Sequence, residues 1–201
     1  MERMKEFLPY ETVRNDALKL AARIYHDGFI PDVIYSSLRG GAYMANVVSE
    51  YFKLALRGRK PVLYAAVVAR SYIDVSSHDA VRIDGWTYSP EYLRQGDRVL
   101  LVDDIYDSGR TLNFLVQALL EKGVPRGDIK VAVHDYKNFT FRDALPVRPD
   151  YWCRRFDIAS PADDRWIHYC SHELVGLSAE ELEEHYYRHD AELRAVLGEF
   201  F

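Results

Sequence analysis

The sequence predicts an α/β protein with a mostly parallel, twisted sheet that is flanked by helices. Apolar segments of strand length alternate along the chain with segments whose apolar residues recur at helical spacing. The segment RVLLVDD at 98–104 is almost continuously apolar before its acids, as expected for a strand that is buried on both faces of a sheet. With 201 residues, of which 48% are hydrophobic, the chain is long enough to enclose a core of its own.

The candidate elements follow one another with clear boundary signals. In chain order they are a helix at 11–27, a strand at 32–37, a helix at 42–52, strands at 62–72 and 98–102, a helix at 111–122, and strands at 130–134, 151–156 and 166–169. Gly28 and Gly123 end the helices that precede them. A capping box of Ser178 and Glu181 opens a last helix. Residues 74–97 are polar and turn-rich, and a connection of that length is typical of a lid or a binding loop.

Composition narrows the class of protein. The net charge is −5, so a general nucleic-acid-binding surface is not expected, and any anion site must be built locally. Neither a membrane-spanning apolar run nor the apolar core of a signal peptide is apparent, which makes the cytoplasm the expected location. Cys153 and Cys170 do not form a CxxC pair, and we expect both to be reduced and buried.

Three aspartates follow the apolar strand at 98–102. Asp103 and Asp104 stand where the strand is expected to finish, and Asp107 begins the turn DSGRT into the next helix. The amino end of a helix binds phosphate through free N–H groups and a favourable dipole, while Gly109 allows a close backbone approach. Carboxylates accept hydrogen bonds from a ribose diol. The pattern therefore favours a ligand with both a phosphate and vicinal hydroxyls.

Two other interpretations of these acids are a capped strand-turn-helix with solvated carboxylates and an acidic pocket of the receiver-domain type. The complete string, however, closely resembles the 5-phosphoribosyl-1-pyrophosphate signature of the type I phosphoribosyltransferases, in particular the hypoxanthine-guanine type. The resemblance runs from about residue 31 to 173 and implies the fold of that family. It implies a single domain over 1–201, with a core at about 31–145 and a small purine-covering hood at about 146–201.

The resemblance assigns the donor, 5-phosphoribosyl-1-pyrophosphate, to two loops. Asp103 and Asp104 would hold the ribose hydroxyls. The 5-phosphate would be wrapped by Asp107, Ser108, Gly109, Arg110 and Thr111.

The string SLRGG at 37–41 is similar to the pyrophosphate loop of the purine enzymes, although an ordinary Gly-Gly turn has the same letters. Leu38, Arg39 and Gly40 would contact pyrophosphate, and Arg39 can do so in bidentate fashion. In the resembling enzymes this loop often carries a non-proline cis peptide bond, which we place between Leu38 and Arg39.

Two further sites rest on the resemblance. Ser71 and Tyr72 are similar to the start of a flexible catalytic loop that shields the reaction centre from water; an edge strand before a surface loop is the alternative. Lys137, just past the strand KVAVHDY, would donate to the purine 6-oxo group and so disfavour adenine, whose amino group is also a donor. A solvated lysine is the alternative there.

The string DRWI at 164–167 is the last part of the resemblance. Trp166 would stack on the purine and the backbone of Ile167 would meet the base edge, whereas a core tryptophan is the alternative. Glu173 falls where the resembling enzymes keep an acid near metal and pyrophosphate. The implied ligands for Mg²⁺ are therefore Asp103, Asp104 and Glu173.

The implied activity is purine salvage: transfer of ribose 5-phosphate to N9 of hypoxanthine or guanine, giving IMP or GMP and pyrophosphate. The catalytic residues would be Arg39, Ser71, Tyr72 and Asp107, with Asp107 handling the proton at purine N7. A xanthine-preferring transferase and a non-catalytic regulator that senses the donor are the alternatives. We expect a homodimer or homotetramer without nucleic-acid or membrane partners.

The segment after Glu173 matches nothing in the resembling enzymes. Glu181, His185 and His189 have metal-ligand spacing on a helix, although a solvated helix face often shows the same pattern. The many aromatic residues of 174–201 favour a role in packing or in oligomer formation.

Overall fold

The computed structural model describes residues 4–72, 80–198 and 200. It divides into two compact units, one formed by 13–163 and the other by 1–12 with 164–201. The predicted single domain with a hood from 146 onward is not tested by this division and stays a prediction. Among the residues that the structure describes, no helix has the length and hydrophobicity to cross a membrane.

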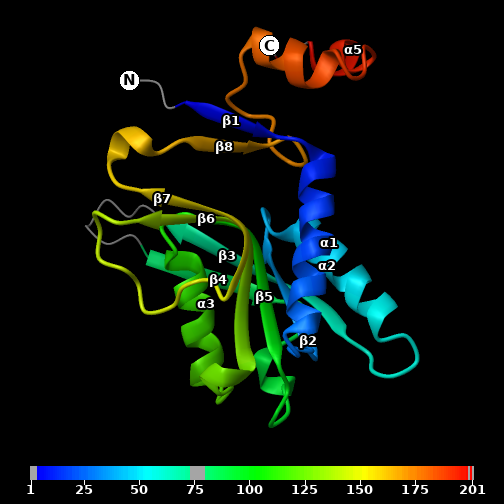
Figure 1. The fold of residues 1–201 in the computed structure, drawn as a ribbon, viewed down its shortest axis with the longest axis vertical. Helices are drawn as coiled ribbons and strands as arrows, with labels where there is room; N and C mark the ends of the chain where they lie inside the picture. Colours follow the sequence, from blue (N-terminus) through cyan, green and yellow to red (C-terminus); the bar gives the residue numbers. More distant parts are fainter. Residues whose placement is uncertain (1–3, 73–79, 199, 201) are drawn as a thin grey trace. The chain divides into compact units, whose positions relative to one another are not determined.

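A six-stranded sheet forms the centre of the larger unit (Figure 1). The strands are β2 (Val33–Leu38), β3 (Leu63–Tyr72), β4 (Ala80–Trp86), β5 (Val99–Tyr106), β6 (Ile129–Phe139) and β7 (Tyr151–Ile158). They lie in the order β4-β3-β2-β5-β6-β7, and only β4, at one edge, is antiparallel to its neighbour. The predicted mostly parallel sheet is confirmed.

Helices cover both faces of this sheet. Helix α1 spans Tyr10–His26, α2 spans Ala42–Ala55 and α3 spans Arg110–Glu121, and 3₁₀ turns occur at Pro90–Tyr92, Arg126–Asp128 and Pro161–Asp163. Leu101 of β5 packs with the apolar face of α3, whereas its neighbours Leu100 and Val102 pack with α1 and α2. Because side chains alternate along a strand, a continuously apolar strand is what two covered faces require.

The smaller unit contains a two-stranded parallel sheet of β1 (Lys5–Leu8) and β8 (Trp166–Tyr169). Its other elements are α4 (Ala179–Leu182), a π-helical turn at Glu183–Tyr187 and α5 (Leu193–Leu197). The capping box of Ser178 and Glu181 is present at the start of α4, as predicted. The buried side chains of this unit include Leu177, Leu182, Tyr186 and Tyr187.

Three expectations about the elements are corrected. Strand β4 lies inside the segment 74–97 that was expected to be a polar connection. Strand β6 continues to Phe139, so Lys137 lies inside a strand rather than past its end. The thiols of Cys153 and Cys170 are free, as expected, but both residues are only partly buried.

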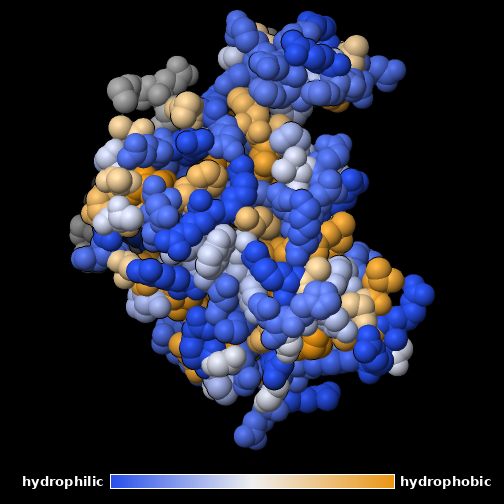
Figure 2. Space-filling model, viewed as in Figure 1, coloured by the Kyte–Doolittle hydropathy of each residue, from blue (hydrophilic) through white to orange (hydrophobic). Residues whose placement is uncertain are grey.

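The face drawn in Figure 2 is mostly hydrophilic, with scattered apolar side chains. Single exposed apolar residues are normal on a folded protein. Those of the larger unit include Tyr92 and Phe114, and those of the smaller unit include Val175 and Phe200.

Candidate active site

The acid pair was expected at the end of its strand, but β5 continues past it to Tyr106, so that expectation is corrected. The Asp103 carboxylate accepts a hydrogen bond from the Asp104 amide at 3.0 Å, and the Asp104 carboxylate accepts one from the Ile105 amide at 2.8 Å. Burial, together with the neighbouring Asp104 charge, raises the pKa of Asp103 well above its usual value, and a hydrogen bond with Ser37 opposes this shift. Two partly buried carboxylates side by side are costly unless a ligand or cation compensates them.

The turn between β5 and α3 forms a cradle. Gly109 caps α3 with a positive φ of 76°, and a Cβ at this position would overlap the Tyr106 ring. A side chain is therefore excluded on two grounds, conformation and space. A cavity of about 200 Å³ opens here, and it is lined by Asp103, Asp104, Ile105, Asp107, Ser108, Gly109, Thr111 and Leu112. The structure thus brings together the residues that were predicted to hold ribose and 5-phosphate, except Arg110, whose side chain lines a neighbouring cavity.

The loop at 37–41 lies against the acid pair. The Leu38–Arg39 peptide bond is cis, as predicted. A Cβ at Gly40 would overlap the Asp104 carboxylate, and a Cβ at Gly41 would lie 2.5 Å from the carbonyl oxygen of Val102. The Gly-Gly pair therefore serves a close approach between two loops, which a simple turn does not require.

A second cavity, of about 190 Å³, adjoins the first at Asp107 and Ser108. Lys137 lines it, and the Lys137 side chain is only 3% exposed. Its Nζ lies 3.9 Å from Oδ1 of Asp107, whose side chain is half-exposed. The solvated-lysine interpretation is therefore wrong, because this cation is buried beside the proposed catalytic acid.

The backbone of Ser71 and Tyr72 lies in β3, where these residues pair with Val81 and Ala80. Their side chains, and the residues at 73–79, fall outside the part of the chain that the structure describes. The role predicted for them stays a prediction.

The remaining predicted site residues belong to the smaller unit. Trp166 is 48% exposed and Ile167 is buried. The backbone of Trp166 is fixed because its amide donates to the Met4 carbonyl at 3.0 Å. The interpretation of Trp166 as a core residue is wrong, and its exposed ring offers a flat face to a heterocycle.

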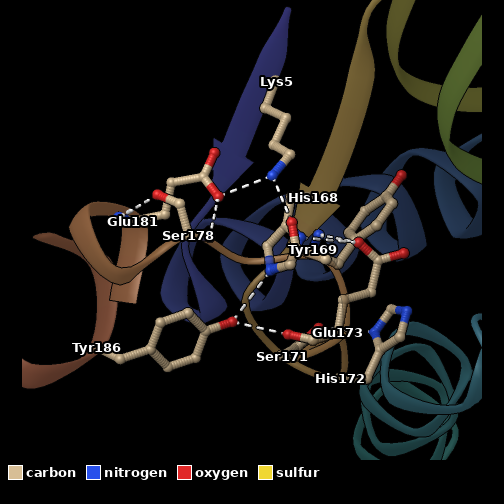
Figure 3. A network of polar contacts seen from close by, with 10 residues as sticks. Lys5, His168, Tyr169, Ser171, His172, Glu173, Ser178, Glu181 and Tyr186 are labelled. Carbon is tan, nitrogen blue, oxygen red and sulfur yellow. Dashed lines mark hydrogen bonds and ion pairs between the residues drawn. The ribbon is translucent and has the colours of Figure 1, made fainter. Parts of the chain in front are cut away.

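Glu173 takes part in a polar network within the smaller unit (Figure 3). Its carboxylate accepts a hydrogen bond from the Tyr169 amide at 3.1 Å and lies 3.4 Å from Nδ1 of His168. The Tyr186 hydroxyl donates to the Glu173 carbonyl at 2.8 Å and lies 3.1 Å from Nε2 of His168. Burial lowers the pKa of His168, which favours its neutral form.

Two of the three residues with metal-ligand spacing in the last helical segment, Glu181 and His185, make packing contacts within the smaller unit. Glu181 pairs with Lys5 at 2.7 Å and completes the capping box (Figure 3), and the ring of His185 stacks on Phe7 at 3.8 Å. Within the described residues, no group of three or more His, Cys, Asp or Glu side chains is arranged to hold a metal ion.

Residues that the sequence did not single out also line the second cavity. Arg142, Asp143 and Arg148 come from the connection between β6 and β7. Irregular loops carry no periodicity, so the clustering of two arginines within seven residues was the only signal.

Comparison with known proteins identifies the class. Residues 6–164 match the family model described as "Phosphoribosyl transferase domain", and the chain belongs to that family. The purine phosphoribosyltransferase of Pyrococcus horikoshii has a similar structure, with a TM-score of 0.64 at 22% identity, covering 87% of this chain and 97% of that one. The fold is therefore the type I phosphoribosyltransferase fold.

Two further proteins are similar to this chain in sequence. The bifunctional protein PyrR of Pseudomonas fluorescens is 29% identical over 147 residues, which cover 71% of this chain and 79% of that protein. The hypoxanthine/guanine phosphoribosyltransferase of Methanohalophilus mahii is 56% identical over 41 residues, 20% of this chain. That match spans only 22% of the Methanohalophilus protein.

Proposed function

We propose that this phosphoribosyltransferase acts in purine salvage and transfers ribose 5-phosphate from 5-phosphoribosyl-1-pyrophosphate to N9 of hypoxanthine or guanine. The products are IMP or GMP and pyrophosphate. The main support for the proposal is the close approach of Gly40 to the Asp104 carboxylate. It brings the proposed pyrophosphate loop at 37–41 next to the acid pair that precedes the proposed phosphate turn at 107–111. A transferase whose donor carries both groups needs these two loops together.

The donor groups follow from this arrangement. The amides and hydroxyls of the turn at 107–111 bind the 5-phosphate, and the carboxylates of Asp103 and Asp104 accept from the ribose hydroxyls. Arg39, at the cis peptide bond beside Gly40, faces the pyrophosphate as a bidentate donor.

The donor set of the acid pair fits Mg²⁺, which prefers one or two carboxylates with substrate oxygens and water. Asp103 and Asp104 would hold the ion, which would relieve their mutual repulsion and supply charge neutralisation for the pyrophosphate. For Glu173 the same role stays a prediction, because its carboxylate already accepts from the Tyr169 amide.

The base is recognised through Lys137, a buried donor for the 6-oxo group, and Asp107, which takes the proton from purine N7 while N9 attacks. The Nζ of Lys137 lies 3.9 Å from Oδ1 of Asp107, so the proposed donor to the base and the proposed proton acceptor line the same cavity. Trp166, with its exposed ring, is proposed to stack on the purine, and Ile167 to present its backbone to the base edge.

The test is incubation with the donor, Mg²⁺ and each of four bases, followed by measurement of pyrophosphate and monophosphate. We expect turnover with hypoxanthine and guanine and none with adenine. Xanthine as the best substrate would move the assignment to the xanthine-preferring alternative. The absence of product with every base would overturn the proposal.

A donor-sensing regulator is the second candidate, and the similarity to a bifunctional protein over 71% of the chain supports it. Calorimetry together with the turnover assay separates the two candidates, since a regulator would bind donor and Mg²⁺ but would turn over none of the bases. A cytoplasmic location and a homodimer or homotetramer are part of the proposal, and light scattering tests the oligomeric state.

A further inference from the structure

The connection between β6 and β7 forms one wall of the cavity that contains Lys137. The structure describes all of its residues, 140–150, and they form neither helix nor strand. In the proposed function this cavity holds the purine, and we name it the base cavity. Five residues of the connection line it: Arg142, Asp143, Ala144, Leu145 and Arg148. A wall without a strand ladder depends on side chains of other elements to fix its backbone.

Asn113 of α3 supplies such a side chain. Its oxygen accepts a hydrogen bond from the Val147 amide at 2.9 Å, and its Nδ2 donates to the Val147 carbonyl at 2.8 Å. This exchange of two bonds is the one that two paired strand residues make. A reversed side-chain amide would place donor against donor and acceptor against acceptor, so the orientation of the Asn113 amide is determined. The Tyr106 hydroxyl donates to the same carbonyl at 2.7 Å.

The same side chain is also attached to the proposed phosphate turn at 107–111. Nδ2 of Asn113 lies 3.0 Å from the Gly109 carbonyl oxygen and 3.2 Å from the Tyr106 hydroxyl. With the Val147 carbonyl, the two hydrogens on this nitrogen have three acceptors within 3.2 Å, which restricts the side chain to one orientation. Asn113 therefore connects the cap of α3, at Gly109, with the wall of the base cavity, at Val147.

We propose that Asn113 is a positioning residue for the base, because it joins the wall of the base cavity to the phosphate turn. The inference rests on the proposed function, which assigns the purine to this cavity and the 5-phosphate to the turn. Asn113 is not among the described residues that line the base cavity, so it acts through the Val147 backbone and the neighbouring Leu145 and Arg148. A wall that is fixed before the purine arrives lowers the cost of binding it.

The donor is expected to depend less on the Asn113 side chain than the base does. Phosphate binds to main-chain N–H groups at the amino end of a helix, and the bond from the Asn113 backbone amide to the Gly109 carbonyl, 3.0 Å long, survives truncation of the side chain. We expect Asn113→Ala to raise the KM of hypoxanthine about tenfold, as the loss of a buried hydrogen bond does, and to keep the KM of the donor within about twofold.

This difference between the two KM values separates positioning from a general folding defect. A folding defect lowers kcat through the loss of active protein and leaves both KM values unchanged. Asn113→Asp is a second variant, which keeps an acceptor for the Val147 amide but loses the donors. It should raise the KM of hypoxanthine as well, so the test does not depend on the folding of the alanine variant.

The matched control is Gln117→Ala, one turn further along α3. Gln117 is exposed, and its side-chain amide donates to Glu121 of the same helix at 3.2 Å. The two substitutions remove the same chemical group from the same helix, but only that at Asn113 releases the wall. The control should keep the kcat and both KM values of the wild type.

Hydrogen exchange of the Val147 amide measures the attachment without any substrate. We expect about tenfold faster exchange in Asn113→Ala than in the wild type and in Gln117→Ala, because the acceptor of this amide is removed. Equal exchange in the three proteins would overturn the inference, and so would faster exchange with an unchanged KM for hypoxanthine. A wild type that turns over no purine would overturn the proposed function and, with it, the role of Asn113 toward the base, whereas equal exchange would overturn the role of Asn113 alone.

Discussion

Asp107 and Lys137 are a pair of opposite charges with very different surroundings, one half-exposed and the other buried. We predict that Asp107→Asn lowers kcat by about 10²–10⁴-fold, the usual worth of a general acid–base group, with little change in the KM of the donor. Steady-state kinetics with hypoxanthine measures both constants. Asp27→Asn, at an exposed position, is the control and should leave them unchanged. Full turnover in Asp107→Asn would remove this residue from the chemistry.

In the proposed function, Lys137 is the residue that selects 6-oxopurines over adenine. We predict that Lys137→Ser narrows the ratio of kcat/KM between hypoxanthine and adenine by at least tenfold, because a donor that opposes the adenine amino group is removed. Side-by-side assays of the two bases give the ratio. A variant that rejects adenine as strongly as the wild type would contradict the assignment.

Gly40 is required by space and not by conformation, since a Cβ there would overlap the Asp104 carboxylate. We predict that Gly40→Ala weakens donor binding at least tenfold by displacing that carboxylate or the loop at 37–41. Gly85→Ala is a matched control, because a Cβ at Gly85 meets no atom within 4 Å. Calorimetry with donor and Mg²⁺ measures the difference, and equal affinities in the two variants would refute the explanation.

At the scale of elements, the sequence predicted the parallel strands of the large sheet, including the edge strand β7, and their helices, but it missed β1 and β4. Strand β1 has four residues, too few for a periodicity to be visible, and its partner β8 lies at the other end of the chain. Strand β4 was hidden in a polar segment because an antiparallel edge strand needs little apolar surface. The pyrophosphate loop, its cis bond and the phosphate turn were predicted because short motifs determine them.

Individual buried hydrogen bonds, such as those of the Tyr186 hydroxyl, stabilise the smaller unit. We predict that Tyr186→Phe lowers the stability of the smaller unit by about 1–3 kcal/mol, because the Glu173 carbonyl and His168 lose a shared buried hydroxyl. Hydrogen exchange of the β8 amides reports this loss. Tyr187→Phe is the control: the Tyr187 ring packs against the Arg194 guanidinium, a contact that survives the change. Equal exchange in both variants would contradict the prediction.

For the whole molecule, the acid pair that is proposed to bind the donor lowers the stability of the fold. The raised pKa means that the Asp103 carboxyl binds more protons in the folded state than in the unfolded chain. The free energy of unfolding therefore falls as the pH rises above the ordinary pKa of an aspartate. We predict that Asp103→Asn raises the Tm of the ligand-free protein by about 2–4 °C, the shift that ~1 kcal/mol gives at this chain length, while donor binding is lost.

Asp150→Asn provides the contrasting variant for that experiment. The Asp150 carboxylate pairs with Lys130 at 2.9 Å and accepts from the Val131 amide at 2.9 Å, so the same substitution should lower Tm. Calorimetric scans at neutral pH show whether each substitution raises or lowers the Tm. A lower Tm for Asp103→Asn would show that the acid pair is not a source of instability.

The pairing of β1 with β8 has a consequence for biosynthesis. Lys5 is translated long before its register partner, Trp166. Long-range strand pairing of this kind is slow to form, and the edge of β1 stays unpaired until β8 has emerged from the ribosome. A nascent chain stalled before β8 should therefore present an open strand edge that chaperones can bind.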